Sequence, residues 1–167
     1  MEISILALPL IASIISGFFG KFIGDRNSEI ITSLLVSISA IFSGLVLYEV
    51  IVNQYQDNIV IATWISSGSL EVNWSMKIDS LSAVMLVVVT SVSALVHVYS
   101  IGYMSHDPHK PRFMAYLSLF TFAMLMLVTS DNFIQLFFGW EGVGLCSYFL
   151  IGFCLLYTSD AADDVAS

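Results

Sequence analysis

A single carboxylate, Glu141, lies inside the apolar stretch FGWEGVGLCSYFLIGF at residues 138–153. Placing a charged carboxylate in the centre of a bilayer costs ~2.5 kcal/mol or more on insertion scales. Removal from water favours the protonated form, whereas a paired cation keeps the group ionised. A carboxylate balanced between these states can take up and release a proton, and this is the functional interpretation of Glu141. The alternative is a protonated side chain that hydrogen-bonds a neighbouring helix and only helps packing.

Three glycines, Gly139, Gly142 and Gly144, flank this carboxylate. Glycine lacks a side chain, so these positions would let a neighbouring helix or water approach Glu141.

His97 is the second candidate, because histidine titrates in the physiological pH range. It belongs to a polar stripe with Thr90, Ser93 and Ser100, spaced as one face of a helix. Lipid cannot satisfy polar groups, so this stripe should face other helices. The alternative for His97 is a neutral ring satisfied by a neighbouring hydroxyl.

The remaining titratable residues favour structural roles. Asp79 opens an apolar run as part of IDSLS and could cap a helix, and Glu49 could reach the membrane interface. His106 and His109 have HxxH spacing in a loop broken by prolines, which gives little reason to expect a metal site. Cys146 and Cys154 are interpreted as small apolar residues. The sequence contains no phosphate loop, haem motif or iron–sulfur spacing, so no cofactor is expected in this chain.

The composition sets the class of protein that carries these groups. The 167 residues are 57% hydrophobic and 11% charged, with a mean hydropathy of +0.89, whereas soluble domains are roughly 25% charged. Five lysines and arginines in total cannot form a basic patch for nucleic acid. The sequence therefore predicts an all-α polytopic membrane protein.

Five apolar runs predict five transmembrane helices, at residues 3–20, 30–52, 79–103, 113–130 and 133–153. Within the first, Ala12, Ser16 and Gly20 give a face small enough for close helix packing. No positive residue precedes the first run, which favours an uncleaved span over a signal peptide. Between the second and third runs, alternating apolar residues around Ser67-Gly68 predict a hairpin.

The basic residues predict the orientation. The first and third loops carry four of them, Lys21, Arg26, Lys110 and Arg112, and the opposite side carries Lys77 alone. Positive loops stay inside, so the N-terminus and the hairpin should be extracytoplasmic. Glu141 would then lie near the middle of the bilayer.

From Ile78 onward, three segments, IDSLSAVML, HVYSIGYMSHDPHKPRFMAYLSLF and SDNFIQLFFGWEGVGLCSYFLIGF, are similar to the subunit L (NADH dehydrogenase subunit 5) family of NADH-quinone oxidoreductase, an antiporter-like membrane subunit of respiratory complex I. The resemblance covers about residues 1–153. It implies the first part of a larger bundle that translocates protons, driven by electron transfer elsewhere in the complex. NADH, FMN, iron–sulfur clusters and quinone are then expected in other subunits, and other membrane subunits and the lipid bilayer are the expected partners.

The resemblance also implies roles for individual residues. Glu141 matches the proton-handling carboxylate of the family, which pairs with a lysine on a later, broken helix. His97 and Asp79 match the family pattern as well, which supports a proton relay at His97 and leaves the role of Asp79 open. The implied location is a bacterial inner membrane, or the mitochondrial inner membrane if the gene is organellar.

Two alternatives remain. A subunit of a multisubunit cation/proton antiporter or of a membrane-bound hydrogenase would share the fold and the intramembrane glutamate, although GVGLCSY favours complex I. An inert truncated fragment is the other alternative. Residues 154–167, CLLYTSDAADDVAS, are polar and acidic, and we expect them to be foreign to the family, with a divergent native terminus as the alternative.

Overall fold

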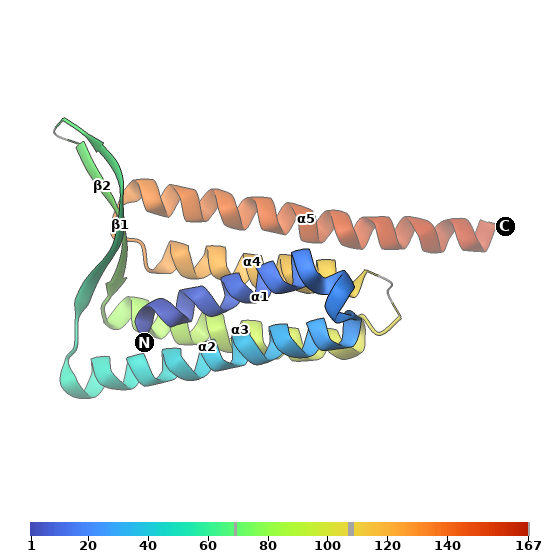
Figure 1. Cartoon of the computed structure of the whole chain (residues 1–167), viewed down its shortest axis with the longest axis horizontal. Helices are drawn as coiled ribbons and strands as arrows, with labels where there is room; N and C mark the ends of the chain where they lie inside the picture. The colour runs from blue at the N-terminus through green and yellow to red at the C-terminus, as the bar shows by residue number, and fades with distance from the viewer. Residues whose placement is uncertain (69, 107–108, 167) are drawn as a thin grey trace.

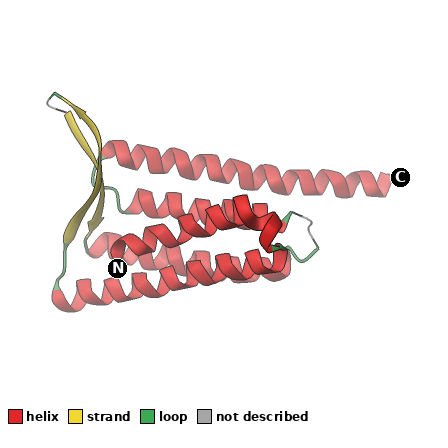
Figure 2. Cartoon of the chain, viewed as in Figure 1, coloured by secondary structure: helices red, strands yellow, loops and turns green. Residues whose placement is uncertain are grey.

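Five helices and one hairpin make up the chain (Figures 1 and 2). The computed structural model describes residues 1–68, 70–106 and 109–166, without the side chains of residue 70 and residues 154–166. The elements are α1 (Glu2–Ile23), α2 (Asp25–Asn53), β1 (Asp57–Ser67), β2 (Leu70–Ile78), α3 (Ser80–Tyr103), α4 (Lys110–Val128) and α5 (Phe133–Ala166).

All five helices are long and apolar enough to cross a membrane, which confirms the predicted fold class. Each contains at least 19 residues, close to the ~20 that a bilayer requires. The largest differences from the expected ranges are at two bounds. Helix α2 begins at Asp25, before the expected Ile30, and α5 continues to Ala166, past the expected end at Phe153. The earlier start of α2 places Glu29, expected in a loop, inside a helix.

Helices α1 to α4 form a bundle, and α5 runs beside α4 (Figure 1). The connections between the helices lie at the two ends of the bundle (Figure 1). The hairpin and the α4–α5 turn lie at one end, and the α1–α2 and α3–α4 connections lie at the other (Figure 1). The second end carries Lys21, Arg26, Lys110 and Arg112, and is called the basic end below.

Small residues bring α1 against α2 and α4. Ser16 Oγ lies 2.6 Å from Ser28 Oγ and donates to the carbonyl of Pro111, also at 2.6 Å. A Cβ at Gly20 would lie 2.6 Å from Pro111 Cβ, so only glycine fits there. Ala12 is fully buried as well. The small face predicted for the first span is therefore a helix contact, as the close packing of membrane helices requires.

The predicted hairpin is present. Strands β1 and β2 pair antiparallel from Asp57↔Ile78 to Ser67↔Leu70, and Gly68 in the turn has a φ of 60°. Gly68 favours this left-handed conformation because it has no Cβ. Trp64 and Trp74 meet Phe138 of α5, with ring centroids 5.2–5.5 Å apart. The hairpin thus packs against the beginning of α5.

Gln135 of α5 is fully buried, and its side chain bonds to the backbone of strand β2. Its Oε1 accepts from the backbone N–H of Ser75 at 3.0 Å, and its Nε2 donates to the Ser75 carbonyl at 2.7 Å. Asn132 caps α5 by accepting from the Gln135 N–H and also donates to the Asn73 carbonyl. These bonds hold the first turn of α5 against β2, and so set how far Glu141, six residues later, lies from the hairpin end.

Asp79 begins α3 through a capping box with Ser82. Asp79 Oδ1 accepts from the Ser82 N–H at 2.8 Å, and Ser82 Oγ accepts from the Asp79 N–H at 2.8 Å. Asp79 precedes the first residue of the span. The hydrogen bond from the Ser82 backbone is the main reason that the pKa of Asp79 lies below its usual value. The ammonium of Lys77, 3.9 Å away, lowers this pKa further.

We expect Gln135→Leu to destabilise the protein by about 1–3 kcal/mol, because it leaves the buried N–H and C=O of Ser75 without partners. Thermal unfolding of the purified protein in detergent measures this. Asn58→Ala is the control, since it removes an exposed hydrogen bond to Asp131 and should stay within about 0.5 kcal/mol. Equal melting temperatures for Gln135→Leu and the wild type would contradict the role of Gln135 as an anchor.

We expect Asp79→Ala to cost about 1 kcal/mol through loss of the cap, and the effect to depend on pH. The pKa of Asp79 is lower in the folded protein, so its stabilisation is complete above the ordinary aspartate pKa. It is lost as the pH falls through the folded value. The melting temperatures of wild type and Asp79→Ala should therefore converge in acid. A gap that stays constant from neutral pH into acid would contradict this.

Candidate functional site

The centre of the bundle contains a polar cluster built around His97, which is fully buried in α3. Its Nδ1 lies 2.7 Å from the carbonyl oxygen of Ser93, one turn earlier on the same helix. Its Nε2 lies 2.9 Å from Ser118 Oγ on α4. A carbonyl can only accept, so Nδ1 carries a hydrogen. Nε2 then accepts from the Ser118 hydroxyl when the ring is neutral and donates to it when the ring is protonated.

The cluster continues through hydroxyl groups. Ser93 Oγ is hydrogen-bonded to Thr121 Oγ1 of α4, and Thr121 in turn contacts the Leu117 carbonyl at 2.9 Å. One turn nearer the hairpin, Thr90 Oγ1 lies 2.7 Å from Ser43 Oγ of α2. Three members of the predicted stripe thus contact neighbouring helices, as expected. Ser100 is also buried but donates within its own helix, to the Val96 carbonyl.

An apolar groove of about 320 Å³ leads to this cluster between α3 and α4. Valine, methionine and leucine side chains line most of it, and Ser93 and Thr121 also border it. The Ser93–Thr121 hydroxyl pair therefore borders this groove.

Glu141 lies on a different surface. Its side chain is exposed, and no hydrogen bond or ion pair from the described residues reaches it. Residues Gly139 and Gly142 face α4 instead: a Cβ at Gly139 would lie 2.9 Å from the Leu127 backbone, and one at Gly142 would lie 3.3 Å from Ala123 Cβ. At 100° per residue, Glu141 points about 200° away from Gly139. These two glycines make room for α4, and not for an approach to the carboxylate. Gly144 has open space around it.

The face of α5 that carries Glu141 is largely uncovered. Within the α5 span, 11% of the residues are buried, against 28–39% in the other four spans. Large aromatic side chains share the exposure, including Phe137, Trp140 and Tyr148. In Figure 1, α5 runs along the outside of the bundle. The structure therefore does not bring Glu141 and His97 into contact, because α4 lies between the helices that carry them.

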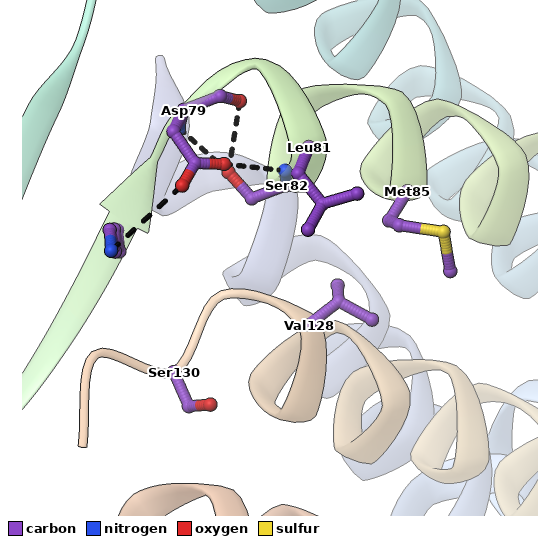
Figure 3. A pocket seen from close by; sticks show the side chains of 7 residues that line it. Asp79, Leu81, Ser82, Met85, Val128 and Ser130 are labelled. Atoms are coloured by element: carbon purple, nitrogen blue, oxygen red, sulfur yellow. Dashed lines mark hydrogen bonds and ion pairs between the residues drawn. The ribbon is translucent and has the colours of Figure 1, made fainter.

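Both carboxylate oxygens of Asp79 have partners: Oδ1 accepts from the Ser82 N–H, and Oδ2 lies 3.9 Å from Lys77 Nζ. Figure 3 shows its carboxylate directed at Ser82 and the neighbouring ammonium, beside a pocket of about 330 Å³ bordered by Leu81, Met85 and Val128. This geometry suits a helix cap and offers no contact to His97 or Glu141. Glu49 is half-buried near the hairpin end of α2.

Metal binding finds no support among the described residues, where no group of three or more histidine, cysteine or carboxylate side chains gathers. His106 and His109 are exposed, and Asp107 between them lies outside the described residues.

Three features escaped the sequence analysis. The α4 partners of His97, Ser118 and Thr121, stand in an apolar run that offers no periodic signal. Gln135 was overlooked because a polar residue at a helix start is ordinary. Glu29 precedes the expected span 30–52 by one residue, although it lies on a polar face of α2. The buried polar residues of that face, at helical spacing, are Glu29, Thr32, Ser33, Ser39 and Ser43, with the apolar Val36 among them.

Known proteins resemble the chain closely. The family model for the N-terminus of chain 5 of NADH-ubiquinone oxidoreductase (complex I) matches residues 64–114. NADH-ubiquinone oxidoreductase chain 5 of Arabidopsis thaliana is 56% identical over 153 residues, 92% of this chain and 23% of the relative. The Chondrus crispus protein of the same name is 51% identical over 166 residues, 99% of this chain and 25% of the relative. NADH-quinone oxidoreductase subunit L of Rickettsia felis is 47% identical over 166 residues, with the same coverage.

A solved structure shares the fold. A chain of the membrane-bound sulfane sulfur reductase, an archaeal respiratory membrane complex, superposes with a TM-score of 0.70 over 89% of this chain and 30% of its own length. Its 17% identity shows a common fold alone.

The sequence matches extend over most of the chain, whereas the chain spans about a quarter of the length of these relatives. The foreign origin expected for residues 154–167 stays a prediction. The chain belongs to the family of NADH-ubiquinone oxidoreductase chain 5, also named NADH-quinone oxidoreductase subunit L.

Proposed function

We propose that this chain is part of a proton-translocating membrane subunit of NADH:quinone oxidoreductase, in which electron transfer in other subunits drives proton movement. The observation that carries the proposal is Glu141, set in GWEGVGLCSY within an apolar span, in a chain 56% identical to a chain 5 relative. An ionisable group inside a membrane span is retained at a free-energy cost, and such groups mark proton and ion pathways.

Glu141 is the proposed proton-handling carboxylate. Its exposed position suits this role if a part of the whole protein outside this chain covers the open face of α5. A cation on that part, a lysine by family resemblance, would hold Glu141 ionised. Movement of the cation away would let the carboxylate take a proton, because an isolated charge is unstable in a low dielectric. The cycle needs no redox group in this chain.

His97 is the proposed relay within the bundle. A proton that arrives at Nε2 reverses the hydrogen bond with Ser118, because the ring nitrogen changes from acceptor to donor. Release of that proton restores the neutral ring. The half-buried hydroxyl of Ser93 and the buried hydroxyl of Thr121 would extend the route along α3 and α4.

The basic end of the bundle is proposed to face the cytoplasm or the mitochondrial matrix, following the positive-inside rule. The N-terminus and the hairpin would then lie on the opposite side. Other membrane subunits of the complex are the proposed partners, with lipid around the remaining surface. NADH, FMN, iron–sulfur clusters and quinone are placed in other subunits.

We expect Glu141→Gln in the full-length protein to reduce proton pumping about tenfold or more, in line with the contribution of a positioned proton-transfer group. Glutamine keeps the shape but cannot be ionised, so assembly should be preserved. Acidification of inverted vesicles during NADH oxidation measures pumping. Glu71→Gln, in the exposed hairpin strand, is the matched control and should pump normally. Normal pumping by Glu141→Gln would refute the role of Glu141.

We expect His97→Gln to reduce pumping about tenfold. The glutamine amide can still donate to a carbonyl and meet Ser118, but it cannot carry a titrating proton. The same vesicle assay, together with native electrophoresis to verify assembly, tests this. An assembled variant that pumps at the wild-type rate would make His97 a buried histidine with a packing role only.

A further inference from the structure

A second carboxylate is buried in the bundle, apart from the groups assigned above. Glu29 stands in the second turn of α2, and 3% of its surface is exposed. Its Oε1 has no hydrogen-bond partner among the described residues. An isolated buried carboxylate is costly, so such a group is expected to bind a proton, water or a cation.

Ser33 repeats this pattern one turn further along α2. It is 6% exposed, and its Oγ also lacks a partner among the described residues. Residues four apart lie on the same face of a helix, so the two unpaired side chains share one buried face of α2. Buried polar groups in folded proteins nearly always have a hydrogen-bond partner, and internal water supplies it where side chains do not. We therefore expect Glu29 and Ser33 to hold water next to the ionisable carboxylate of Glu29.

The helix register places this site nearer the basic end than the His97 cluster, with Ser33 about one turn from the depth of His97. The bond between Ser43 and Thr90 fixes the alignment of the antiparallel helices α2 and α3. Ten residues back along α2 lead to Ser33, and ten residues onward along α3 lead to Ser100, each about 15 Å toward the basic end. Ser33 and Ser100 are thus at the same depth. Ser100 is 3% exposed, and His97 lies one turn deeper on the same helix.

Charged residues of both signs lie near Glu29: Asp25 and Arg26 on α2, and Lys110 at the start of α4. No described cation comes within 4.0 Å of the carboxylate to fix it as an ion pair.

We propose that Glu29 is a second proton-binding carboxylate, which holds water together with Ser33 and passes protons between the basic end of the bundle and the His97–Ser118 pair. The inference rests on the proposed proton-translocating function and extends it with an entry site. The competing explanation is a permanently protonated glutamate that only packs.

Three variants of the full-length protein in its assembled complex separate these explanations: Glu29→Gln, Glu29→Asp and Ser33→Ala. Glu49→Gln is the matched control, because it makes the same change on the same helix at the opposite end. Proton pumping per NADH oxidised is measured in inverted vesicles, and native electrophoresis reports assembly.

We expect Glu29→Gln to pump severalfold less than the wild type, and Glu29→Asp to retain more pumping than Glu29→Gln, because aspartate keeps a titratable group. A packing role predicts the reverse order, since glutamine preserves the shape and aspartate does not. Ser33→Ala should lower pumping about twofold, and Glu49→Gln should not. The reverse order, or wild-type pumping in Glu29→Gln, would overturn the proposal. If Glu29→Gln does not assemble, wild-type pumping by Ser33→Ala would overturn it instead.

Glu141→Gln, measured in parallel, keeps the two proposals distinguishable. Normal pumping in that variant would refute the proposed function itself. Impaired pumping in Glu141→Gln combined with normal pumping in Glu29→Gln would refute only the role of Glu29.

Discussion

Every polar group inside a membrane bundle must find its partner within the protein, because lipid offers none. This constraint explains most of the contacts between α1, α2, α3 and α4. Their serines and threonines bond to carbonyls of the preceding turn or to hydroxyls across a helix boundary, as Ser16 does with Ser28. Hydrophobic attraction between helices is weak in lipid, so close packing of small residues and these bonds hold the bundle together.

The same constraint makes the exceptions informative. Glu29 and Ser33 keep unpaired oxygens inside the bundle, and Glu141 presents a carboxylate on the uncovered face of α5. The carboxylates of Glu29 and Glu141 are unstable as bare charges in a low dielectric, and the buried hydroxyl of Ser33 costs free energy without a hydrogen-bond partner. Among the described residues, Ser75 Oγ in the hairpin is the one other buried side-chain atom without a hydrogen-bond partner. Within the membrane helices, Glu29, Ser33 and Glu141 are therefore the places where a proton, water or a further part of the protein is expected.

The His97 cluster and α5 lie in different parts of the structure. The His97 cluster is enclosed between α3 and α4, whereas α5 is attached through its packing on α4 and through Gln135 at the hairpin. Helix α4 contacts both, with Ser118 facing His97 and Leu127 facing Gly139. Helix α4 is thus the element that connects α5 to the buried cluster.

Much of the fold, and one of the candidate site residues, could be predicted from local sequence patterns. Hydropathy and length determined that the chain has five membrane helices, and alternation around Ser67-Gly68 determined the hairpin, because both signals are carried by consecutive residues. The spacing of Thr90, Ser93 and His97 determined that one face of α3 is buried. The sequence also singled out Glu141, since a charge in an apolar run needs no structure to be noticed.

The tertiary structure decided which groups meet. It gave His97 its partner on α4, placed Gly139 and Gly142 against α4 and away from Glu141, and buried Glu29, which the pattern had left in a loop. These outcomes depend on the rotation and register of one helix against another. A contact such as Gln135 with Ser75 joins residues 60 positions apart. Periodicity within one segment says which face is buried but not against what, so only the packed helices could specify these partners.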